Sequence, residues 1–115
     1  MGGQSILLPT SDWRGTGWAM SALAKAALTG GESSAGDYCV WLKDDSGNVT
    51  PVIWPHGFRA RRDPLILMDE NGEVVAREGD CLSLTGGFVP VDMREPCSMG
   101  QDQAFLAQVI EKINT

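Results

Sequence analysis

The chain has 115 residues, 43% of them hydrophobic and 21% charged, which is the balance of a single folded domain and too hydrophobic for a disordered segment. Its formal net charge of −6 gives a surface that on average repels phosphate groups, so nucleic acid is not an expected partner. No apolar run approaches the roughly 20 residues that cross a bilayer, and residues 1–9 lack the basic and apolar segments of an export signal, which leaves the compartment open.

Residues 1–22 are predicted to form an extension that precedes one small β-barrel domain over residues 23–115. Turn-forming residues surround Trp13 and Trp18 within the extension. Two large aromatic rings seldom stay free in solvent, so the segment is either a flexible lead-in or an arm that packs on another surface. The next residues, 19–28, are rich in alanine and leucine, and they fit a short helix and a first strand equally well.

Residues 30–36 are rich in glycine and serine and predict a break that no regular element crosses. Aromatic and β-branched residues follow at 38–42 and 49–54, with turn formers between them, and predict a hairpin. Pro51 lacks a backbone donor, so it should lie at an edge, a bulge or a wide pair. The motif Trp54-Pro55-His56-Gly57 predicts a type I turn with glycine at its fourth position.

A second hairpin is predicted around Asn71-Gly72, the strongest short hairpin signal, with strands at 65–68 and 73–76. Apolar residues at consecutive positions 65–68 indicate a strand covered on both faces, as in a closed or two-layered sheet. A later strand begins at Cys81, and Gly86-Gly87 predicts a bulge or a close backbone approach. Residues 103–113 show helical spacing, yet they can also supply the strand that closes a barrel.

Several short motifs follow one another between residues 37 and 100: Cys39-Val40-Trp41-Leu42, Trp54-Pro55-His56-Gly57, Glu78-Gly79-Asp80, Gly86-Gly87-Phe88-Val89-Pro90 and Cys97. Their order and spacing resemble a group of small, chiefly actinobacterial proteins of unknown function, many of which are exported or lipid-anchored. The resemblance implies a small five-stranded OB-like barrel. It also implies a disulfide between Cys39 and Cys97, with Cys81 as a local variation.

The fold expected from these observations is mainly β: a closed or partly open antiparallel OB-like barrel of five to six strands, with an irregular N-terminal arm and at most a short helix. The 14 glycines, spread along the chain, agree with many short strands joined by tight turns.

The three cysteines allow one bridge and one free thiol, or three reduced thiols. Cys81 lies in an alternating apolar run, which predicts a buried and unreactive thiol. Together with His56 the cysteines are enough for a zinc site, but none is paired at the usual spacing of two to four residues, so we expect no metal and no cofactor. His56, the single histidine, lies in a turn without an accompanying nucleophile or phosphate-binding loop, so we do not expect an enzyme.

The function expected from the sequence is a non-enzymatic structural or interaction module that docks on another protein or on itself, with Trp13 and Trp18 in the contacting arm. The alternative is an OB-like domain that binds an anionic sugar, a polymer or single-stranded nucleic acid. Its candidate ligand-binding residues are Trp54, His56, Arg59, Arg61 and Arg62. The same arginines also fit a solvated strand edge paired with nearby carboxylates.

Overall fold

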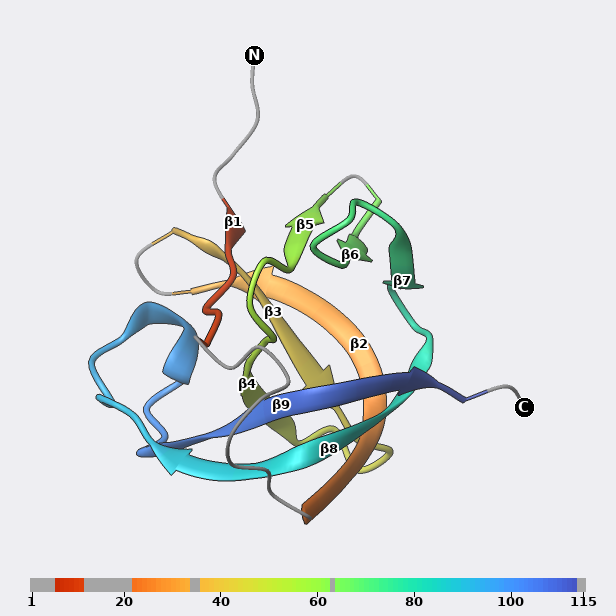
Figure 1. The fold of residues 1–115 in the computed structure, drawn as a ribbon. Helices are drawn as coiled ribbons and strands as arrows, with labels where there is room; N and C mark the ends of the chain where they lie inside the picture. The colour runs from red at the N-terminus through yellow and green to blue at the C-terminus, as the bar shows by residue number, and fades with distance from the viewer. Residues whose placement is uncertain (1–5, 12–21, 34–35, 63, 114–115) are drawn as a thin grey trace.

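The computed structural model describes residues 6–11, 22–33, 36–62 and 64–113, and these residues form two β-sheets (Figure 1). The larger sheet contains six strands: β1 (Ile6–Leu7), β2 (Ala22–Glu32), β3 (Tyr38–Lys43), β4 (Val49–Ile53), β8 (Cys81–Pro90) and β9 (Gln103–Lys112). The smaller sheet contains β5 (Arg59–Arg61), β6 (Ile66–Met68) and β7 (Val74–Arg77). A short 3-10 helix, η1 (Pro96–Ser98), lies between β8 and β9, and the described residues include no α-helix. The expectation of a mainly β fold is confirmed.

Five strands of the larger sheet form a closed ring of hydrogen-bonded neighbours. The order is β3, β2, β8, β9, β4, and β4 pairs again with β3. All of these pairs are antiparallel except β4 with β9, which is parallel and includes only Val52 with Phe105 and Ile53 with Leu106. The ring is therefore joined least extensively between β4 and β9.

β1 lies beside β3, along the same edge that β4 occupies farther on. β4 pairs with the second half of β3, from Trp41 to Lys43. β1 runs parallel to the first half, where it pairs with Tyr38 and Cys39. Residues 8–11 then cross to the end of β4, where Trp54 donates to the Pro9 carbonyl at 2.8 Å and Ser11 donates to the Trp54 carbonyl at 2.9 Å. Part of the sequence assigned to an extension thus packs along the sheet.

Both segments that fitted either a helix or a strand are strands wherever the structure describes them. Residues 22–32 form β2, which pairs with β3 on one side and β8 on the other. Residues 103–112 form β9, and five successive side chains of it, at 104–108, are buried. A strand that is covered on both faces carries apolar residues at successive positions. This explains why the apolar residues of β9 also fitted the spacing of a helix.

β2 continues through Gly30 and Gly31, so the break predicted at residues 30–36 begins too early. These two glycines pair with Val40 and Cys39. A Cβ atom on Gly31 would lie 2.8 Å from the Trp41 ring, and one on Gly30 would meet the ring of Tyr38. The glycines leave room for two aromatic rings that lie across the strand, so here they serve packing rather than a turn.

The core fills the ring and extends to the smaller sheet. Its central side chains include Leu28, Leu42, Leu82, Leu84 and Phe105, all buried. The smaller sheet (green in Figure 1) contributes buried Leu67 and Ala76 from one face, together with Leu65 just before β6. The inserted sheet is thus part of the same hydrophobic core.

Both predicted hairpins and the predicted bulge are confirmed. β3 pairs with β4, and β6 pairs with β7 around Gly72, whose φ is 83°. The register of β8 against β9 shifts between Thr85 and Gly86, where a Cβ atom would meet the carbonyl oxygen of Leu106. The turn after Trp54 is displaced by one residue from its predicted place. The backbone N–H of Phe58 donates to the Pro55 carbonyl, so the turn comprises residues 55–58. Gly57, with a φ of 82°, therefore occupies the third position of the turn and not the fourth.

Candidate functional site

A disulfide joins the loop at residues 91–102 to the beginning of β3. Cys39 and Cys97 are bonded, with their Cα atoms 5.6 Å apart and a sequence separation of 58. Cys39 has no exposed surface and Cys97 is also buried. The pairing implied by the family resemblance is therefore confirmed.

The side chains next to the disulfide follow from the alternation of β3. Val40 and Leu42 point into the core, whereas Cys39 and Trp41 pack with Cys97 in a second small apolar cluster. The indole Nε1 of Trp41 donates to the carbonyl oxygen of Cys97 at 2.8 Å. The loop is thus fixed to the outer face of β3 by a covalent bond and by a buried hydrogen bond.

Further hydrogen bonds define the shape of this loop. Val91 donates its backbone N–H to the carbonyl of Asp102 at the base of the loop. The Ser98 hydroxyl lies 2.9 Å from the Met93 carbonyl and 2.8 Å from the Glu95 carbonyl. Because Ser98 is buried, these hydrogen bonds tie the end of η1 to the residues that precede it in the loop.

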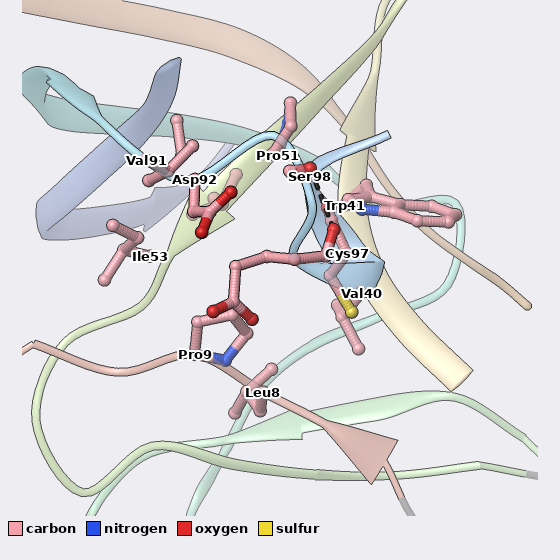
Figure 2. Close-up of a pocket in the computed structure, with 13 residues that line it drawn as sticks. Leu8, Pro9, Val40, Trp41, Pro51, Ile53, Val91, Asp92, Cys97 and Ser98 are labelled. Atoms are coloured by element: carbon pink, nitrogen blue, oxygen red, sulfur yellow. Dashed lines mark hydrogen bonds between the residues drawn. The ribbon is translucent and has the colours of Figure 1, made fainter. Parts of the chain in front are cut away.

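An apolar cavity of about 440 Å³ opens between this loop, β4 and the N-terminal segment (Figure 2). We call it the β4 groove. Its lining residues are Val40, Trp41, Pro51, Val52, Ile53 and Ala104 from the ring, Leu8 and Pro9 from the N-terminal segment, and Val91, Asp92, Glu95, Cys97 and Ser98 from the loop. It lies on the side of β3 where β1 pairs with the first half of that strand and β4 with the second half.

The only charged side chains that line the β4 groove within the described chain are those of Asp92 and Glu95. Arg94 donates to both carboxylate oxygens of Asp92, from Nε at 3.1 Å and from Nη2 at 2.9 Å. These side-chain hydrogen bonds, with a further one from the Arg94 backbone N–H, hold the pKa of Asp92 below its ordinary value. The groove therefore combines apolar walls with two acidic side chains.

The residues predicted to bind an anionic ligand do not lie at this groove. Trp54 is completely buried in the core, so its ring is not available to stack on a ligand in this structure. Arg62 lies over the Tyr38 ring, 3.9 Å from its centroid. Arg59 and Arg61 are exposed on the outer face of β5, and His56 is half-buried in the turn before that strand. The predicted contacting residues Trp13 and Trp18 lie outside the described residues.

The prediction for Cys81 is wrong, since this free thiol is exposed. Along β8 the inward positions belong to Leu82 and Leu84, and the alternation places Cys81 on the outer face. Within the described ranges, no cluster of three or more histidine, cysteine or acidic side chains could hold a metal ion. In the same part of the chain no helix has the length and apolarity to traverse a membrane.

Comparison with known proteins gives no match among protein-family models, curated protein sequences or solved structures. The site is therefore interpreted from its own geometry. Sequence reasoning missed the β4 groove, because its residues come from five separate segments and none of them forms a chemical motif. The available signal was in β4, where Pro51 and Ile53 alternate with Val52, which points into the core. This alternation indicates that the outer face of β4 is also apolar.

Proposed function

We propose that this chain is a non-enzymatic binding module built on a partly open OB-like barrel, and that the β4 groove is its docking site. The strand order supports the fold assignment. The five ring strands, numbered 1 to 5 in chain order, are β2, β3, β4, β8 and β9. Their order around the ring is 1-2-3-5-4-1, and the third and fifth strands are parallel. This is the order of an OB-fold, which is a five-stranded, partly open Greek-key barrel. In this comparison the smaller sheet stands between the third and fourth ring strands.

The position of the β4 groove is the observation that carries the proposal. OB-folds bind their ligands on the face of the second and third strands, beside the loops that join strands one to two and four to five. In this chain those strands are β3 and β4, and the latter loop comprises residues 91–102. The groove is lined by both strands and by that loop. Figure 2 shows Pro51 and Ile53 on one side of it and Leu8 and Pro9 on another.

We infer that the occupant is an extended, apolar segment of a partner protein. The chain's own residues 8–11 already lie along one wall as an extended segment, with backbone hydrogen bonds to Trp54. The same surface therefore accommodates extended polypeptide. Acidic side chains at the groove and a net charge of −6 oppose an oligonucleotide or an anionic sugar at this site. Apolar walls with a few polar groups suit a peptide anchored by its side chains.

The test uses the oxidised chain and a displayed library of random linear peptides. We expect enrichment of apolar peptides that bind the wild-type protein and lose binding to the variant Ile53→Asp, which introduces a charge into the groove. Val109→Asp is the matched control, because Val109 is 48% exposed on β9 away from the groove. Peptides that bind both variants equally, or a library that yields no binder, would overturn the proposal.

The alternative function, binding of an anionic ligand, is supported by a different surface. Arg61 on β5 and Arg77 on β7 both pair with Ile66 on the middle strand, β6, so the two arginines lie on either side of Ile66 in the smaller sheet. Both are exposed, as is Arg59. Titration with a sulfated polysaccharide at low salt tests this function: the triple variant Arg59→Gln, Arg61→Gln, Arg77→Gln should lose binding. Equal binding by the triple variant would remove this candidate.

A further inference from the structure

We propose that the partner segment places a lysine or arginine side chain against Asp92 and Glu95 of the β4 groove. This inference rests on the proposed function, because it specifies the chemistry of the segment that occupies the same groove. It is carried by three observations: the direction of the Asp92 carboxylate, the counter-ion that this carboxylate already holds, and the unpartnered Glu95 carboxylate.

Asp92 shows how a cation fits at this place. Figure 2 shows its carboxylate directed toward the cavity, which Ile53 and Val91 also line. Both of its oxygens accept hydrogen bonds from the guanidinium of Arg94. The Arg94 side chain is 90% exposed, so it reaches this carboxylate from the solvent side and little else holds it there. An incoming guanidinium or ammonium group can therefore replace or join it, because an exposed ion pair of this kind contributes little to stability.

Glu95 supplies a second negative charge that is not compensated. It lies on the same turn as Asp92, with its backbone N–H donating to the Asp92 carbonyl at 3.0 Å. Among the described residues its carboxylate has no hydrogen-bond or ion-pair partner. Arg94 can neutralise one of the two carboxylates, so the lining keeps a net negative charge. That charge lies beside the apolar walls of the groove.

Lysine and arginine suit this combination better than a small free cation does. Their long apolar stems can lie along Pro9 and Ile53, while the charged head reaches a carboxylate. The net charge of −6 also attracts basic segments to the surface and raises their association rate. A neutral apolar peptide gains only the contacts with the walls.

The experiment compares peptide selection on the wild-type chain with selection on Glu95→Gln. Wild-type protein should enrich apolar peptides that contain lysine or arginine, and Glu95→Gln should enrich apolar peptides without that bias. The best wild-type peptide should bind Glu95→Gln about 10-fold more weakly, equivalent to about 1.4 kcal/mol, and its affinity should depend less on salt. Glu111→Gln, a charge removal at an exposed position on β9, is the matched control and should bind like the wild type.

A second variant distinguishes recognition from damage to the fold. Arg94→Ala removes the competing counter-ion of Asp92, so it should bind the basic peptide several-fold more tightly, a gain that misfolding does not produce. Groove-binding peptides without a preference for lysine or arginine would overturn this inference and leave the proposed function standing. A library without any groove binder would overturn both. Unchanged affinity in both Glu95→Gln and Arg94→Ala would also contradict the inference.

Discussion

Trp41 donates a hydrogen bond from its indole Nε1 to the carbonyl of Cys97, the residue that is disulfide-bonded to Cys39, two positions before Trp41 on the same strand. One residue of the loop is thus held at two atoms by one face of β3. Because Cys97 also lines the β4 groove, the shape of the groove depends on this pair of attachments.

The first prediction concerns the indole hydrogen bond. Trp41→Phe removes the donor of the buried hydrogen bond to the Cys97 carbonyl, which should lower the free energy of unfolding by about 0.5–1.5 kcal/mol beyond the loss of ring volume. Trp54→Phe makes the same change in size at a buried tryptophan whose Nε1 has no partner among the described residues. Urea denaturation of both variants measures the difference. Equal destabilisation would mean that the hydrogen bond contributes nothing.

The second prediction concerns the disulfide. A cross-link that closes a loop of 58 residues stabilises the folded state by about 4 kcal/mol in the chain-entropy model, so reduction should lower the melting temperature markedly. The variant Cys39→Ala, Cys97→Ala should melt like the reduced wild type and should ignore added dithiothreitol. A wild-type melting curve that dithiothreitol does not change would contradict this expectation.

The third prediction follows from the exposed position of Cys81. Protein purified without reductant should contain one thiol that reacts with a soluble disulfide reagent in the absence of denaturant, because Cys81 is exposed while the other two cysteines are bonded. The variant Cys81→Ser should show none. A thiol that reacts only after unfolding would restore the buried position that the alternating pattern suggested.

The fourth prediction concerns acid stability. The backbone N–H of Arg77 donates to the Asp80 carboxylate at 2.8 Å, and Lys112 lies 3.3 Å from it; together they hold the pKa of Asp80 below its ordinary 3.8. A carboxyl group whose pKa is lower in the folded chain stabilises it fully above the unfolded pKa, about 4, and loses that contribution as the pH falls through the lower folded value. Asp80→Asn should therefore be less stable than wild type at neutral pH, with the gap closing below about pH 4.

Urea denaturation at several pH values between 2 and 7 checks this expectation. Glu111→Gln is the control, because it removes a charge beside Lys112 but keeps the acceptor for the Arg77 N–H. Its difference in unfolding free energy from wild type should not shrink as the pH falls below about 4. A constant gap between Asp80→Asn and wild type across this range would refute the assignment.

Local signals in the sequence predicted both hairpins and the bulge well. Asn71-Gly72 and Gly86-Gly87 have backbone requirements that few other residues meet, so their structural meaning is nearly independent of the rest of the fold. Glycines at 30 and 31 failed as a turn signal for the opposite reason. Their purpose is to make room for rings on the neighbouring strand, which only the register of β2 against β3 reveals.

The candidate site was much less predictable. Its place on a predicted strand next to the strand of Trp41 suggested Trp54 as a ligand-stacking residue, but its position at the end of β4 turns it into the core. The β4 groove depends on how the N-terminal segment passes from β3 to the end of β4 and on the path of a loop, and neither is encoded as a local pattern. The charge of Asp92 and Glu95 was visible in the sequence, but not the apolar surface beside it.

The parallel pairing of β4 with β9 affects the order of events during folding. The ring closes only when residues near 52 meet residues near 105, so its last strand must be available before the core is sealed. Contacts so distant in sequence make closure slow compared with the formation of the two hairpins, which involve near neighbours. A chain that ends before β9 would leave long free edges on β4 and β8, where intermolecular strand pairing and aggregation begin.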